Sequence, residues 1–204
     1  MKRPADLPTI GNPFSSRHVR PGAVPFFFAE GLTAEGLVER LRSSGWRGQI
    51  VGPHGSGKSA LVAALVPAIE AAGRRVFLYE LHEGQRRLPA GFPPLEAEAG
   101  QAVVVFDGYE QLSAWSRFRL RRLCDSARWG LVVTAHRPVG LPDLLRLAPD
   151  PALAQRIVDW LLREADVRIA PQEVSAAFAA RAGDLREMLF DLYDLCERRL
   201  REKG

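Results

Sequence analysis

The stretch GPHGSGKS at residues 52–59 limits the possible folds more than any other feature of the chain. It satisfies the pattern GxxxxGK[ST], with a strand expected at 47–51 before it and a helix expected at 58–72 after it. Glycines in this context let a loop wrap closely around phosphate oxygens, and the N-terminus of the helix adds partial positive charge. The sequence therefore predicts a phosphate-binding loop (P-loop) between a strand and a helix.

The rest of the chain alternates short apolar stretches with helical patterns. Further strands are expected at 75–81, 102–107 and 131–135, with a short fifth at 144–148, and further helices at 33–44 and 111–128. Short strands that are apolar at nearly every position, alternating with helices, predict a parallel sheet covered on both faces. The expected fold class is α/β, with a three-layer α/β/α core.

The two ends of the chain differ from this pattern. We expect residues 1–30 to form an extended, proline-rich arm that packs on the core, because its phenylalanines need burial. Residues 31–148 then form the core, and residues 149–204 form a small unit of three helices. Pro151 and Pro171 stand where they would open helices, and Asp184 stands where it would cap the last one.

Composition narrows the class of protein without naming a partner. A chain of 204 residues with a net charge of +4 is compatible with an acidic partner such as a nucleic acid, but does not require one. The two cysteines, Cys124 and Cys196, lie in amphipathic helical patterns, so buried thiols are expected. The N-terminus has no apolar signal segment, and no stretch approaches the length of a membrane span. We expect a soluble, cytoplasmic protein.

The P-loop predicts which residues contact the ligand. Lys58 would reach the β- and γ-phosphates of a nucleotide, and the hydroxyl of Ser59 would ligate Mg²⁺. We expect His54 to point outward from the loop, although a catalytic role stays open. The expected nucleotide-binding residues are Gly52, Pro53, His54, Gly55, Ser56, Gly57, Lys58, Ser59 and Ala60.

A second motif, VVVFDGYE at 103–110, ends a buried strand with a carboxylate. Asp107 is expected to bind Mg²⁺ through a water molecule, because a carboxylate at the end of a buried strand needs a partner. The next carboxylate, Glu110, comes only after Gly108 and Tyr109. Glu110 either orients the attacking water, with Gly108 giving the turn its freedom, or caps the helix that begins near Gln111.

With these motifs placed, residues 31–201 resemble the AAA+ superfamily, including its ORC-like and STAND relatives. VGPHGSGKS resembles Walker A and VVVFDGYEQL resembles Walker B. LVVTAH stands where that family has sensor 1, and GDLREML is similar to sensor 2. The resemblance implies a sheet in the order 5-1-4-3-2, with ATP or ADP and Mg²⁺ between the core and a helical lid. It also implies that the arm, through NPFSSRHVRPG, contacts the adenine.

The resemblance suggests roles for residues near the nucleotide. Thr134 either hydrogen-bonds the attacking water or γ-phosphate, with His136 as a weaker substitute, or only forms good strand structure. Arg186 either contacts the phosphates from the lid or is a salt-bridged surface residue. The expected catalytic residues are Lys58, Asp107, Glu110, Thr134 and Arg186, and the expected metal ligands are Ser59 and Asp107.

The chain also departs from the family pattern. The loop LHEGQRRLPAGFPP replaces the second helix, and no clear arginine finger is present. One helix carries a cluster of arginines that forms either a solvated face or an interface to nucleic acid or another protomer; they are Arg117, Arg119, Arg121 and Arg122.

Three functions fit these patterns. The first is an ATPase that hydrolyses ATP slowly when alone and couples the nucleotide to lid movement, self-assembly or binding of a protein partner. The second is a phosphotransferase that acts on a small molecule. The third is a nucleotide-sensing interaction module without useful turnover.

Overall fold

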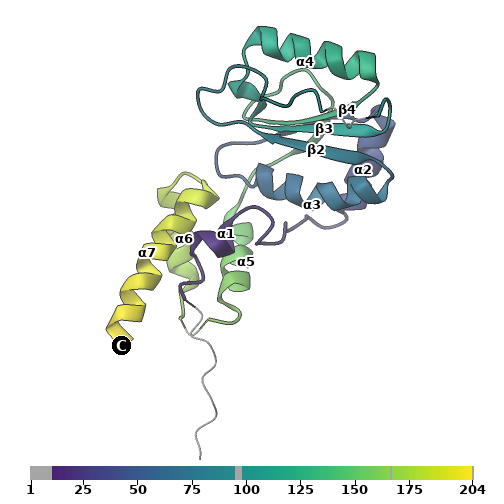
Figure 1. The fold of residues 1–204 in the computed structure, drawn as a ribbon. Coiled ribbons are helices and arrows are strands. Elements are labelled where there is room, and N and C mark those ends of the chain that lie inside the picture. Colours follow the sequence, from purple (N-terminus) through teal and green to yellow (C-terminus); the bar gives the residue numbers. More distant parts are fainter. Residues whose placement is uncertain (1–10, 95–97, 166, 204) are drawn as a thin grey trace, which may run out of the picture. The chain divides into compact units, whose positions relative to one another are not determined.

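The computed structural model describes residues 11–94, 98–165 and 167–203, and these residues form two compact units. The segment from Phe28 to Ala148 makes the first unit, here called the core. The segments on either side of it, up to Phe27 and from Pro149, make the second, here called the helical unit. Figure 1 shows the elements of both units.

The core is built on a five-stranded parallel sheet. Its strands are β1 (Arg47–Val51), β2 (Arg75–Glu80), β3 (Ala102–Asp107), β4 (Gly130–Ala135) and β5 (Asp143–Arg146). They pair in the order β2-β3-β4-β1-β5, which confirms the predicted order and the α/β class. The central strand β4 is buried at every position, and β3 is buried up to Asp107, because helices cover both faces of the sheet.

Three helices cover the sheet within the core. Figure 1 shows α4 (Ala114–Ala127) on one face and α2 (Ala34–Ser43) and α3 (Lys58–Ala71) on the other. Thr33 caps α2, since its hydroxyl accepts a hydrogen bond from the N–H of Gly36.

The helix expected at 111–128 starts later than the sequence suggested. A single 3₁₀ turn, η1 (Tyr109–Gln111), comes first, and Ser113 then caps α4 by accepting from the N–H of Ser116. The turn forms because Gly108 adopts a left-handed φ of 83°, which bends the chain out of β3. Glu110 therefore lies inside η1, and the interpretation of Glu110 as the cap of a helix is wrong.

The helical unit contains α1 (Ser16–Val19), α5 (Pro151–Leu162), α6 (Pro171–Ala180) and α7 (Leu185–Lys203). Pro151 and Pro171 open their helices as predicted. Asp150 accepts from the N–H of Leu153, and Asp184 accepts from two N–H groups at the start of α7, so both carboxylates act as caps. The core of this unit is a buried apolar cluster that includes Val158, Phe178, Met188 and Leu192.

The arm packs differently from the sequence prediction. Phe14 is buried in the apolar cluster of the helical unit, with 2% of its surface exposed. The side-chain amide of Asn12 donates to the carbonyl of Tyr193 and to Oε1 of Glu197, both on α7. The expectation that the arm packs on the core is therefore wrong for residues 11–27, because the helical unit supplies the burial that Phe14 needs. Residues 1–10 lie outside the described residues.

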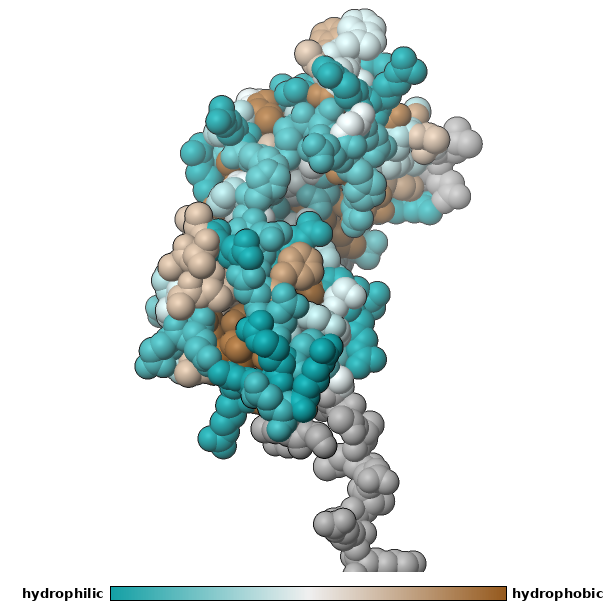
Figure 2. All heavy atoms as spheres, turned by 90° about the vertical axis from the view of Figure 1, so that its left-hand side faces the viewer, coloured by the Kyte–Doolittle hydropathy of each residue, from teal (hydrophilic) through white to brown (hydrophobic). Residues whose placement is uncertain are grey.

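Both cysteines are buried, as predicted. Burial raises the pKa of the Cys124 thiol to about 12 and also raises that of Cys196, so neither thiol is reactive near neutral pH. Among the described residues, no helix combines the length and apolar character that a membrane span needs. The face shown in Figure 2 is mostly hydrophilic, with apolar side chains in small groups.

Candidate nucleotide-binding site

The P-loop connects β1 to α3 and lies at the carboxyl end of the sheet. Gly52 follows β1 where space is tightest, since a Cβ there would lie 2.6 Å from Oγ of Ser56 and 3.0 Å from the carbonyl oxygen of Leu147. The Ser56 hydroxyl donates to the carbonyl of Pro53, which holds the loop across its base. A larger residue at position 52 would open the loop, so this glycine is needed for the close wrap that a phosphate requires.

Lys58 and Ser59 are the first two residues of α3. The N-cap position is Gly57, which has no side chain to satisfy the helix N–H groups, so this end of the helix suits an anion. The ammonium of Lys58 donates to the carbonyls of Gly52 (2.8 Å) and Pro53 (2.6 Å), which places its charge over the loop. These groups have the chemistry that phosphate oxygens need.

Asp107 ends β3, and its carboxylate is held by the neighbouring strand β4. The hydroxyl of Thr134, which is fully buried, donates to Oδ1 of Asp107 and accepts from the N–H of Gly108 at 2.9 Å. Because a hydroxyl has one proton, Thr134 directs it to Asp107 rather than to a phosphate. In the structure Thr134 therefore acts first as a positioning residue for Asp107.

A metal ion at this site would depend on few protein ligands. The described residues contain no group of three or more His, Cys, Asp and Glu that could enclose a metal. Mg²⁺ is commonly bound by one or two protein oxygens together with phosphates and water. The Ser59 hydroxyl and the Asp107 carboxylate suit that kind of binding, because both are hard oxygen donors.

Glu110 is brought back toward the P-loop by η1. Its Oε1 lies 3.1 Å from Nδ1 of His136, the residue that follows β4. Its Oε2 is closed off from solvent and has no hydrogen-bond partner among the described residues. A buried carboxylate oxygen without a donor has unused acceptor capacity, so this atom can accept a hydrogen bond from any donor that enters the site.

Two histidines connect Glu110 to the P-loop. The rings of His136 and His54 stack with their centroids 3.7 Å apart. Burial holds the pKa of His136 below its ordinary range; the Glu110 carboxylate opposes this shift, and Lys58 and His54 add to it. At neutral pH His136 is thus neutral and can donate from Nδ1 to Glu110. The sequence predicted only minor roles for both histidines. The one feature that pointed to His136 is its position directly after the central strand β4.

Two of the four clustered arginines support the turn that carries Glu110. Arg121 donates to the hydroxyl of the buried Tyr109 (3.0 Å) and to the carbonyl of Val139, and Arg117 donates to the carbonyl of Leu112 (2.8 Å). The other two arginines, Arg119 and Arg122, are exposed. The cluster is therefore not one uniform face.

Arg186 and the arm belong to the helical unit. Arg186 is exposed on the first turn of α7, with its guanidinium carbon 5.9 Å from the centre of the Phe190 ring. No salt bridge to Arg186 is present among the described residues. Its contact with a phosphate stays a prediction.

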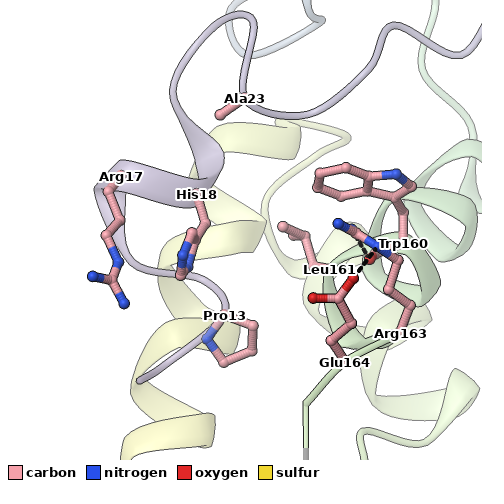
Figure 3. Close-up of a pocket in the computed structure, with 8 residues that line it drawn as sticks. All are labelled: Pro13, Arg17, His18, Ala23, Trp160, Leu161, Arg163 and Glu164. Atoms are coloured by element: carbon pink, nitrogen blue, oxygen red, sulfur yellow. Dashed lines mark hydrogen bonds and ion pairs between the residues drawn. The ribbon is translucent and has the colours of Figure 1, made fainter. Parts of the chain in front are cut away.

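The arm segment with the predicted adenine contact lines a pocket with α5 (Figure 3). The pocket has a volume of about 120 Å³, and it is lined by Pro13 and His18 from the arm, Trp160 from α5 and Arg163 directly after α5. Arg163 lies over the Trp160 ring at 3.7 Å and pairs with Glu164. Pockets that enclose drug-sized ligands are about 300–1,000 Å³, so this one does not enclose a whole nucleotide.

Comparison with known proteins shows similarity in structure. No protein-family model matches the chain, and no curated protein matches its sequence. The chain is similar to Cdc6p from Pyrobaculum aerophilum, with a TM-score of 0.65 and 14% identity over 94% of this chain and 66% of that one. It is also similar to the Walker-type ATPase PABY2304 of Pyrococcus abyssi, with a TM-score of 0.52 and 11% identity over 80% of this chain and 66% of that one.

A third similar structure is RuvB of Thermotoga maritima, a Holliday junction branch migration motor. Its TM-score is 0.49 at 14% identity, over 76% of this chain and 57% of that one. The chain thus spans about two thirds of the length of the first two structures and less of the third. The shared fold and the P-loop at its expected place support one conclusion: the chain has the fold of the AAA+ P-loop ATPases, the superfamily that its motifs resemble.

Proposed function

We propose that the chain is a Mg²⁺-dependent ATPase in which Glu110 orients the attacking water. The observation that supports this most directly is the pairing of Glu110 with His136, which stacks on His54 of the P-loop. This pairing holds a carboxylate beside the phosphate-binding loop, with one oxygen buried and unpartnered. A module that only binds nucleotide has no need for such a carboxylate.

The residues divide the work of hydrolysis. The N–H groups of the P-loop and the Lys58 ammonium bind the β- and γ-phosphates, while Thr134 holds Asp107 in place. Bound Mg²⁺, held by Ser59 and through Asp107, would supply neutralisation of the charge on the phosphates. Oε2 of Glu110 accepts a proton from water, which directs the water oxygen toward the γ-phosphorus.

We expect turnover to be slow for the chain alone. Fast phosphoryl transfer also uses a cation opposite the leaving group, which a neighbouring protomer or partner often provides and which is worth about 10³–10⁵ in rate. In the core, Arg117 and Arg121 are engaged in bracing η1. The missing cation would therefore come from a second copy or a protein partner, coupled to movement of the helical unit.

The test compares three single variants with the wild type. Glu110→Gln keeps the shape of the side chain but removes its basicity, so turnover should fall by about 10²–10⁴ while ATP affinity stays unchanged. Lys58→Ala should instead lose ATP binding. Glu70→Gln is the matched control, because Glu70 is an exposed glutamate on α3.

Phosphate release and calorimetric ATP affinity are measured for each protein. If Glu110→Gln hydrolyses ATP at the wild-type rate, Glu110 does not take part in the mechanism. Tight ATP binding by the wild type without any phosphate release would instead identify a nucleotide sensor, and release only with an added acceptor would identify a phosphotransferase.

A further inference from the structure

The outward face of α4 carries an unusual combination of side chains. Trp115 is 70% exposed and Phe118 is 56% exposed, although large aromatic side chains are normally buried. Their rings stack, with centroids 5.8 Å apart and planes 28° from parallel. Together they form a flat aromatic platform on a helix that Figure 1 shows on the outer side of the sheet.

Exposed arginines accompany this platform. Arg119 and Arg122 follow Trp115 at helical spacings of four and seven residues, so they lie along the same face, within about 10 Å of it along the helix axis. Neither has a hydrogen-bond or ion-pair partner among the described residues. The acidic residue of α4, Asp125, is paired with Arg47 at 2.5 Å and does not offset them.

A second segment adds positive charge beside the first turn of α4. The carbonyl of Arg86 accepts from the N–H of Ser113 (3.0 Å) and from the hydroxyl of Ser116 (2.9 Å). This contact holds the loop that contains Arg86 and Arg87, whose side chains are exposed, beside the first turn of α4. The face as a whole is cationic and aromatic, so its partner must be anionic and offer flat surfaces.

We propose that this face of α4, with Trp115, Phe118, Arg119 and Arg122, binds single-stranded nucleic acid. Bases stack on exposed aromatic rings whatever their sequence, and arginines neutralise the phosphates between them. A duplex fits less well, because its bases already stack on one another. A stable protein interface buries about 800 Å² on each partner around an apolar centre, whereas here two aromatic side chains stand among charges.

The experiment measures the fluorescence anisotropy of labelled oligothymidylate and oligouridylate with the full chain. Each strand has about 20 nucleotides, longer than the roughly 4–16 nucleotides that a binding module covers. Trp115→Ala should weaken binding by about ten- to a hundredfold, whereas Trp115→Phe should keep most of it. Tryptophan fluorescence should be quenched by the oligonucleotide in the wild type and much less in Trp115→Phe.

The charge contribution is tested through salt. Between about 50 and 200 mM salt, the double variant Arg119→Ala/Arg122→Ala should lower the slope of log K against log [salt] by about 1.4, or about 0.7 for each phosphate contact. The matched control is Arg40→Ala/Arg42→Ala, which removes two exposed arginines from α2. It should leave the slope unchanged. Circular dichroism checks that each variant is folded.

Several results would overturn the proposal. One is the absence of binding to either strand at the lower salt concentration. Another is binding that Trp115→Ala leaves unchanged, since phosphates alone would then explain it. Tighter binding of a duplex of the same length would exclude base stacking on the platform. Equal competition by polyglutamate would assign the face to an acidic protein instead.

Discussion

Thr134 makes hydrogen bonds to two neighbours at once: its hydroxyl donates to the carboxylate of Asp107 and accepts from the N–H of Gly108. Thr134→Val removes both hydrogen bonds without changing the size of the side chain. We expect the free energy of unfolding to fall by about 1–3 kcal/mol, because a buried N–H and a carboxylate oxygen lose their partner. Urea unfolding measures this loss, and Mg²⁺-dependent ATP binding should weaken with it.

Thr134→Ser is the matched variant, since it restores the hydroxyl. It should recover most of the stability and the Mg²⁺-dependent binding. If Thr134→Val is as stable as Thr134→Ser, the hydroxyl does not hold Asp107 or Gly108 in place.

The depressed pKa of His136 predicts how turnover depends on pH. Burial is the main cause of the shift, so His136 stays neutral while the pH falls through about 6.5, the ordinary value for histidine. Below its own lower pKa it becomes charged, and a charged His136 would make Glu110 a weaker base. The rate of turnover should therefore hold through pH 6.5 and decline only at lower pH.

His136→Asn keeps an N–H donor for Glu110 but cannot be protonated. Its rate should be lower overall, and the decline assigned to His136 should be missing from its pH profile. If the two profiles have the same shape, the decline belongs to a group other than His136.

At the scale of elements, Gly108 determines where β3 ends and where Glu110 goes. A Cβ on Gly108 would lie 2.9 Å from the carbonyl oxygen of Leu81, and its φ of 83° is strained for any L-residue. Gly108→Ala should therefore destabilise the core by more than about 1–2 kcal/mol, the cost of the φ alone.

Gly100→Ala is the matched control for this prediction. Gly100 has a similar φ of 75°, but a Cβ there would meet nothing within 4 Å. Thermal or urea unfolding should show a clearly larger loss for Gly108→Ala. If both variants lose the same free energy of unfolding, the close contact between the new Cβ and the carbonyl of Leu81 adds nothing to the cost.

The strands were predictable because their apolar residues leave little choice of structure. The expected range of β3 is the observed one, and β4 begins one residue earlier than expected. The start of α4 was not predicted correctly. Gly108 makes the turn after β3 and Ser113 then caps α4, and the two residues lie against Leu81 and Arg86, which the sequence pattern does not reveal. Individual P-loop residues could likewise be placed from their motif.

The pairing of His136 with Glu110 could not be predicted in the same way. It joins the end of β4 to the turn after β3, so it depends on the register of two neighbouring strands and on the shape of η1. The position of the arm was missed for a similar reason. Composition shows that Phe14 needs burial, but not which of two apolar clusters receives it.

At the scale of the whole molecule, one prediction concerns Arg186, which belongs to the helical unit. If Arg186 contacts the γ-phosphate, Arg186→Ala should lower the affinity for ATP more than that for ADP. A charge-assisted contact is worth about 1.5–3 kcal/mol, or roughly ten- to a hundredfold in affinity. Calorimetry with both nucleotides measures the difference.

Arg198→Ala is the control, since Arg198 is another exposed arginine on α7. It should change neither affinity. Equal weakening of ATP and ADP by Arg186→Ala would place the guanidinium away from the γ-phosphate.

The helical unit combines segments from before and after the core in the sequence. This affects the order in which the two units can fold during synthesis. During synthesis the core has all its strands once residue 148 has left the ribosome. Phe14 and Asn12 emerge much earlier than their partners on α7. Because domains commonly fold while the chain is being made, the core can form before the helical unit. Phe14 thus stays uncovered until α7 has been made, and chaperones that bind nascent chains have access to it during that time.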